Sequence, residues 1–79
     1  MKTLYLVIPC YNEEEVLPET SKRLLQKIRD LETQGRISPQ SRILFVDDGS
    51  KDNTWPMISE LHRQDEHFSG LKLAHNRGH

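Results

Sequence analysis

The chain has 79 residues, of which 34% are hydrophobic and 29% charged, and its 11 basic and 12 acidic side chains leave a formal net charge of -1. This length suits one small domain and is too short for two. The balance of charge argues against general electrostatic binding to nucleic acid, and no apolar run approaches the ~20 residues that span a bilayer. Cys10 is the single cysteine, so no internal disulfide forms, which fits a cytoplasmic protein.

The first predicted element is a buried strand over residues 4–8. This run is apolar, and Pro9 keeps the residue before it extended. A helix is then predicted from about Val16 to a stop at Gly35, because glutamates at its start complement the helix dipole and apolar residues recur with helical spacing. The apolar stripe consists of Val16, Leu17, Leu24, Ile28 and Leu31.

The rest of the chain repeats this order. A strand is predicted over residues 43–46, followed by a helix capped by Asp52 or Asn53 with His62 and His67 at its surface or half-buried. Ser69 and Gly70 are expected to end that helix before a third strand over residues 71–74. The order predicts an α/β fold, a Rossmann-like βαβαβ parallel sheet in a three-layer α/β/α arrangement.

Three loops are expected to meet at the carboxyl edge of this sheet, where open α/β folds bind ligands. Residues 9–14 carry Tyr11 and Glu13, residues 47–54 begin with an acidic pair, and residues 75–79 contain Arg77. Acceptors and an aromatic face suit a base and ribose, whereas a guanidinium suits phosphate. Because no glycine-rich phosphate loop is present, the pattern argues against a P-loop NTPase or dinucleotide enzyme and favours another kind of nucleotide pocket.

Three segments at these loops resemble family-2 glycosyltransferases with the GT-A fold. They read V-I-P-C-Y-N-E-E over residues 7–14, V-D-D-G-S-K-D-N-T over residues 46–54, and N-R-G-H over residues 76–79. Their order and spacing are similar to those of the branch that transfers sugars to polyprenyl phosphate, which includes dolichol-phosphate mannosyltransferases and bactoprenol glucosyltransferases. The resemblance covers essentially the whole chain.

The resemblance implies a nucleotide-sugar site made of Pro9, Tyr11, Glu13, Asp47, Asp48 and Arg77. Asp48 would accept a hydrogen bond from uracil or guanine, and Asp47 would support its loop or reach the nucleoside. Arg77 would lie close to the base or the phosphates. The parent enzyme would move a sugar from a UDP- or GDP-sugar to an acceptor, with polyprenyl phosphate favoured, at the cytoplasmic face of a membrane.

The chain departs from the family in one respect. Family members carry an Asp-x-Asp metal motif after a fourth strand and a later catalytic base, and neither occurs here. Residues 1–79 are therefore expected to be the N-terminal portion of one catalytic domain, truncated before that motif, with no catalytic or metal-binding residue of its own. The complete enzyme would use Mg²⁺ or Mn²⁺ to offset charge on the departing diphosphate. Bare sheet edges also make self-association an expectation.

Two other interpretations stay open at this point. A receiver-like signalling module also places paired acids at strand ends, where they bind Mg²⁺ and a phosphoryl group. In this chain the pair follows the second strand and no aspartate follows the third, which argues against a receiver. The other interpretation is a structural fragment without activity, and truncation alone would produce one.

Overall fold

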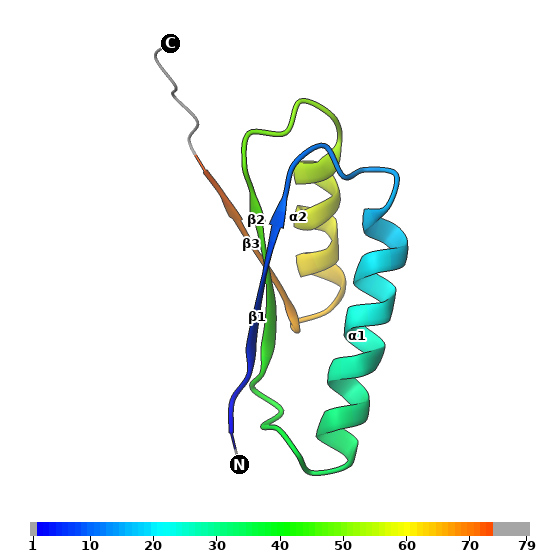
Figure 1. The fold of residues 1–79 in the computed structure, drawn as a ribbon, viewed down its shortest axis with the longest axis vertical. Helices are drawn as coiled ribbons and strands as arrows, with labels where there is room; N and C mark the ends of the chain where they lie inside the picture. The colour runs from blue at the N-terminus through cyan, green and yellow to red at the C-terminus, as the bar shows by residue number, and fades with distance from the viewer. Residues whose placement is uncertain (1, 74–79) are drawn as a thin grey trace.

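The computed structural model describes residues 2–73, which form a three-stranded parallel sheet and two helices. In chain order the elements are β1 (Tyr5–Cys10), α1 (Leu17–Thr33), β2 (Arg42–Asp47), α2 (Thr54–Gln64) and β3 (Phe68–Lys72). The strands lie in the order β1-β2-β3, with Val7 opposite Leu44 and Leu44 opposite Ser69. This arrangement confirms the predicted α/β class and the Rossmann-like βαβαβ order (Figure 1).

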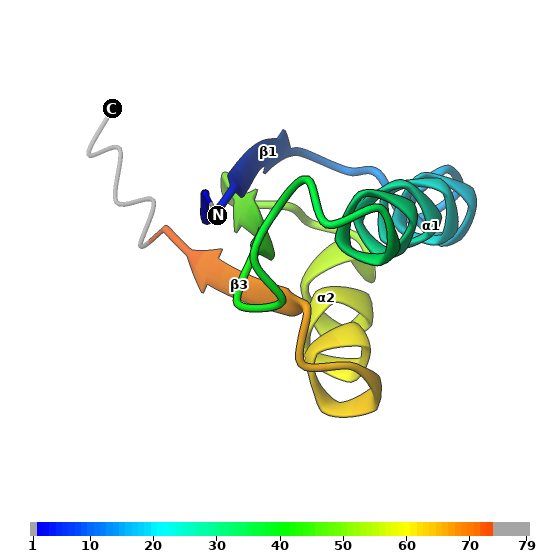
Figure 2. The same cartoon turned by 90° about the horizontal axis from the view of Figure 1, so that it is seen from below.

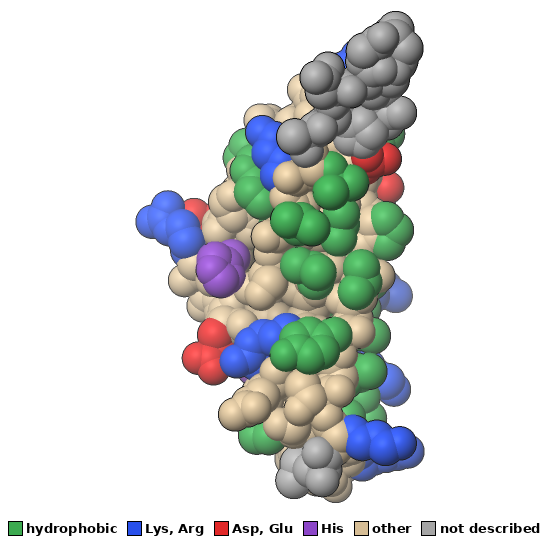
Figure 3. Space-filling model, turned by 90° about the vertical axis from the view of Figure 1, so that its left-hand side faces the viewer, with side chains coloured by type: hydrophobic (Ala, Val, Ile, Leu, Met, Phe, Trp, Pro, Cys, Tyr) green, Lys and Arg blue, Asp and Glu red, His purple; other side chains and the backbone are tan. Residues whose placement is uncertain are grey.

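Both helices cover the same face of the sheet (Figure 2). Right-handed crossovers that step in one direction across a parallel sheet place their helices on one side. Residues 2–73 therefore form two of the three layers that the sequence predicts. The other face is bare and apolar: Tyr5 is 64% exposed, Val7 59% and Leu71 49%, and Figure 3 shows hydrophobic side chains gathered there.

The core lies between the sheet and the two helices. Phe45, in the middle of β2, is fully buried and stacks on Phe68 of β3 with 5.8 Å between ring centroids. Ile28 of α1 and Ile58 of α2 close over the sheet with no exposed surface. The predicted stripe of α1 holds except at Val16, which is 50% exposed because it occupies the N-cap position, before the first helical turn.

The third strand begins earlier than the sequence predicts. Helix α2 ends at Gln64 with Asp65 extended, so Ser69 and Gly70 lie inside β3 and do not terminate the helix. Gly70 is required there because α2 packs directly on it. A Cβ atom at this position would clash with Cγ2 of Ile58 and stand 3.2 Å from Cζ3 of Trp55. The glycine therefore marks a close approach of helix and strand, a role that glycine often has within strands.

Substitution of Gly70 by alanine is expected to destabilise the fold by about 1–3 kcal/mol, because the added methyl group overpacks the contact between α2 and β3. Urea unfolding followed by circular dichroism measures the change. Ser69→Ala is the control, since Ser69 is the neighbouring residue of the same strand and points to the other face. Equal stability of the two variants would contradict the packing argument.

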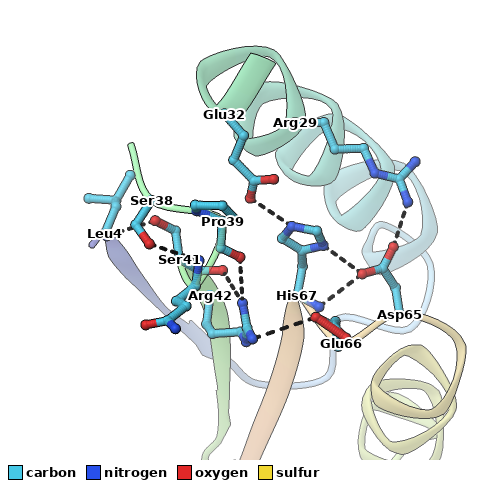
Figure 4. Close-up of polar contacts among 11 residues, drawn as sticks. Leu4, Arg29, Glu32, Ser38, Pro39, Ser41, Arg42, Asp65, Glu66 and His67 are labelled. Carbon is cyan, nitrogen blue, oxygen red and sulfur yellow. Dashed lines mark hydrogen bonds and ion pairs between the residues drawn. The ribbon is translucent and has the colours of Figure 1, made fainter. Parts of the chain in front are cut away.

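A cluster of charged side chains joins α1 to the segment before β3, near the amino ends of the strands (Figure 4). Nδ1 of His67 lies 2.7 Å from Oδ1 of Asp65, and its Nε2 lies 2.7 Å from Oε2 of Glu32 on α1. Nη2 of Arg29 donates to Oδ2 of Asp65 at 2.6 Å. His67 thus precedes β3 and is not a residue of α2, because the helix ends at Gln64.

Candidate functional site

The carboxyl ends of the strands lie at one edge of the sheet, as predicted (Figure 1). Cys10 ends β1 opposite Asp47, and Asp47 ends β2 opposite Lys72. The amide of Asp48 donates to the carbonyl of Cys10 at 2.9 Å, which continues the pairing of β1 and β2 one residue beyond the end of β2. The first loop (residues 11–16) and the acidic loop (residues 48–53) therefore leave the sheet side by side.

Asn12 joins the first loop to the acidic loop through its backbone and its side chain. Its amide donates to Oγ of Ser50 at 2.9 Å, and its Oδ1 accepts a hydrogen bond from the amide of Lys51 at 2.8 Å. The φ angle of Asn12 is 51°, in the left-handed region that asparagine tolerates better than most residues. Asn12 thus both adopts this unusual backbone conformation and makes two hydrogen bonds between the loops.

A second set of hydrogen bonds joins the loops at the start of α2. The amide of Glu13 donates to Oγ1 of the buried Thr54 at 2.7 Å, and the amide of Glu14 donates to Oδ2 of Asp52 at 3.2 Å. The Glu14 carboxylate accepts from the amide of Asn53 at 3.3 Å. Oδ1 of Asp52 also accepts from the amide of Thr54, the first residue of α2, at 2.9 Å, whereas Asn53 occupies the predicted N-cap position without a side-chain capping bond. Together with the bonds of Asn12, these contacts form the interloop network.

Two ionisable groups at this edge have shifted pKa values. Burial, assisted by the nearby charges of Glu13 and Asp47, raises the pKa of the Cys10 thiol to about 11. The thiol is therefore protonated at neutral pH, which excludes it as an activated nucleophile. Partial burial acts to raise the pKa of Asp52, but hydrogen bonds from Thr54 and Glu14 outweigh it and lower that pKa, so Asp52 is ionised in the network.

The two adjacent acids occupy different environments. Asp47 has no exposed surface; its Oδ1 accepts from the amide of Ser50 at 3.3 Å, and its Oδ2 has no partner among residues 2–73. Asp48 is only partly buried. Of the two roles predicted for Asp47, burial favours support of the acidic loop over contact with a nucleoside. Asp48 is then the acid of the pair that has accessible surface.

The other predicted site residues lie beside this pair or outside the described residues. Tyr11 is 51% exposed in the first loop, and Pro9 is exposed at the end of β1. Pro9 and the half-buried Glu13 also line a cavity of about 160 Å³, which is smaller than the ~300 Å³ of a typical ligand pocket. The predicted position of Arg77 lies outside residues 2–73. The structure thus gathers five of the six predicted residues, Pro9, Tyr11, Glu13, Asp47 and Asp48, at one edge.

Sequence reasoning identified the loops but missed the residues that connect them. Asn12, Ser50 and Thr54 bond between loops that lie about 40 positions apart in the chain, with sequence separations of 38 to 41. The available signal was the density of small polar residues directly after two apolar strands. Those residues are also common helix caps, so their pairing follows only once the strand register is known.

No group of three or more His, Cys, Asp or Glu side chains among residues 2–73 is arranged to hold an ion. The sequence itself contains no Asp-x-Asp motif. Within the same range, neither helix has the length and apolar character needed to cross a membrane.

The fold and the edge described above define a Rossmann-like α/β unit in which a first loop carrying Tyr11 and an acidic second loop leave the carboxyl ends of adjacent strands. The chain belongs to glycosyl transferase family 2, whose family model matches residues 5–79. This match confirms the family expected from the three sequence segments.

Two curated relatives place the chain within this family. It is 50% identical over 76 residues to an uncharacterised glycosyltransferase, YkoT, of Bacillus subtilis strain 168, covering 96% of this chain and 23% of the relative. It is 36% identical over 74 residues to the undecaprenyl-phosphate 4-deoxy-4-formamido-L-arabinose transferase of Proteus mirabilis strain HI4320, covering 92% of this chain and 21% of that protein. The chain thus spans about a fifth of the length of either relative, and it resembles a polyprenyl-phosphate transferase in sequence, as predicted.

Proposed function

We propose that this chain is the nucleotide-sugar-binding part of a glycosyltransferase that takes its sugar from a UDP- or GDP-sugar. One observation carries the proposal: in a chain of family 2, the interloop network joins the loop that carries the exposed Tyr11 to the loop that carries the partly buried Asp48, at the carboxyl edge of the sheet. Tyr11 offers a face on which a base stacks, and Asp48 offers acceptors for the ring N–H groups of uracil or guanine.

The remaining predicted residues take supporting roles in this proposal. Asp47 lies under the acidic loop and holds its amide at Ser50 in place. Pro9 and Glu13 shape the end of β1 and the start of the first loop, and Arg77 neutralises charge near the base or phosphates. The receiver-like alternative is set aside because the chain belongs to a different family.

For the parent protein we propose polyprenyl phosphate as the acceptor and the cytoplasmic face of a membrane as the location. The support is the 36% identity to a relative named as an undecaprenyl-phosphate transferase. In this reaction the acceptor oxygen attacks the anomeric carbon and the nucleoside diphosphate leaves. The charge on that diphosphate calls for Mg²⁺ or Mn²⁺, which the complete enzyme would supply outside residues 2–73. This chain alone is then expected to bind nucleotide without turnover.

The test is an NMR titration of the chain with UDP and with GDP, each with and without Mg²⁺. We expect amide shifts centred on Tyr11 and Asp48, and a comparison of the two ligands ranks the bases. Asp48→Ala removes a charged acceptor, which weakens the preferred nucleotide by about tenfold or more.

Asp30→Ala is the matched control for this titration, since Asp30 is an exposed aspartate in the last turn of α1, away from the carboxyl ends of the strands. It is expected to bind like the unmodified chain. Equal affinity of Asp48→Ala and Asp30→Ala would sink the assignment of Asp48 to the base.

A further inference from the structure

Asn12 stands between the two groups that the proposed function assigns to the nucleoside. We propose that Asn12 is a positioning residue that holds Tyr11 and Asp48 in their binding geometry, an inference that rests on the proposed function. It directly follows Tyr11, and its hydrogen bonds reach Ser50 and Lys51, just beyond Asp48 in the chain. Asn12, the neighbour of Tyr11, is therefore hydrogen-bonded to the residues two and three positions beyond Asp48.

Two requirements at this position favour asparagine, one from the backbone and one from the side chain. The φ angle of 51° is disfavoured for most side chains, and the side chain must also supply an acceptor for the amide of Lys51. Glycine adopts the same φ but has no acceptor, whereas alanine has neither property. Aspartate keeps both the tolerance for this conformation and the acceptor oxygen. The variants at this position therefore separate the two demands.

The rest of the interloop network does not replace these contacts. The bonds of Glu13 and Glu14 reach residues 52–54, at the start of α2, and they keep the helix end in place. The amide of Asp48 bonds to the carbonyl of Cys10 at 2.9 Å, which holds its backbone at the end of β1, and the bonds of Asn12 add contacts to Ser50 and Lys51 further along the acidic loop. Loss of the Asn12 acceptor is thus expected to alter the acidic loop while the fold and the helix end stay intact.

The test compares nucleoside affinity in Asn12→Gly, Asn12→Asp and Ser50→Ala by NMR titration with uridine and guanosine. These probes carry no phosphate, so the charge that Asn12→Asp introduces does not repel them. Removing one cross-loop bond in Asn12→Gly or Ser50→Ala is expected to weaken binding about three- to tenfold, whereas Asn12→Asp stays within about twofold of the unmodified chain. Amide exchange at Lys51 is expected to accelerate in Asn12→Gly and to be restored in Asn12→Asp.

Ser41→Ala is the control for a general loss of stability. The buried Oγ of Ser41 accepts from the amide of Leu4 at 2.9 Å, at the opposite end of the sheet from the loops. This variant is expected to lower Tm and leave nucleoside affinity unchanged. Unchanged affinity in Asn12→Gly, or an equal loss in Asn12→Asp, overturns the positioning role while the proposed function stands. Absence of binding by the unmodified chain to the nucleosides and to UDP and GDP overturns the proposed function and this inference with it.

Discussion

Phe45→Ala is expected to lower the free energy of unfolding by about 3–5 kcal/mol, a large part of the stability of a small domain. Phe45 has no exposed surface, and it stacks on Phe68 at the centre of the sheet. Truncation of a buried phenylalanine costs about 3–5 kcal/mol through lost burial and the cavity left behind. A domain of 79 residues buries a modest share of its surface, and native domains have a total stability of only ~5–15 kcal/mol. Loss of this ring therefore removes a large part of what holds the fold.

The matched control for this substitution is Val7→Ala. Val7 lies in β1 on the bare face of the sheet and is 59% exposed, so its truncation leaves no cavity. Its cost is expected to stay below about 1 kcal/mol, the range of strand propensity effects. Urea unfolding of both variants, followed by circular dichroism and tryptophan fluorescence from Trp55, gives the two free energies. Similar costs for the two substitutions would mean that Phe45 is not the centre of the core.

The sequence predicted the strands and helices because their local patterns were strong. Continuous apolar runs gave the first two strands, and helical spacing with Leu17 and Ile28 inward gave α1. The prediction failed at Ser69 and Gly70, where a glycine that normally ends a helix lies inside β3. Only the packing of Trp55 and Ile58 over Gly70 explains this position, and such a contact is not visible in a local pattern.

The number of layers and the burial of the acidic pair could not be predicted from any single segment, because both depend on how the strands are ordered and packed. The βαβαβ order left the order of strands in the sheet open, and it is the sequential order β1-β2-β3 that places both helices on one face. The acidic pair was visible as Asp47 and Asp48, but the full burial of Asp47 follows from the alternation of β2 against the helices. The resemblance supplied the candidate residues, and the structure separated a supporting acid from an accessible one.

The stability of the chain is expected to fall as pH rises above neutrality, and His67 is the reason. Both ring nitrogens of His67 face carboxylates, so the imidazolium, with a proton on each nitrogen, is the form that these contacts favour. Burial acts to lower the pKa of His67, but the hydrogen bonds to Asp65 and Glu32 outweigh it and raise that pKa above the ordinary 6.5. The contribution is thus complete below about pH 6.5 and is lost as pH rises through the raised pKa.

Asp65 sets the acidic limit of the stability that the whole cluster contributes. Burial acts to raise its pKa, but hydrogen bonds from His67, with the charge of Arg29, lower it below the ordinary 3.8. That contribution is present above about pH 3.8 and is lost as pH falls through the lowered pKa. The cluster is therefore expected to stabilise the fold most at mildly acidic pH, between these two limits.

Urea unfolding at about pH 5.5 and about pH 8.5 is expected to show a loss of about 1–3 kcal/mol at the higher pH, the size of a charge-assisted hydrogen bond in a half-buried site. His67→Gln should have lower stability at the acidic pH and a smaller difference between the two conditions, because its side chain carries no proton to lose. Thr33→Gln changes an exposed, non-ionisable residue of α1 next to Glu32 and should keep the full pH dependence. A pH dependence that survives unchanged in His67→Gln would show that a group other than His67 causes it.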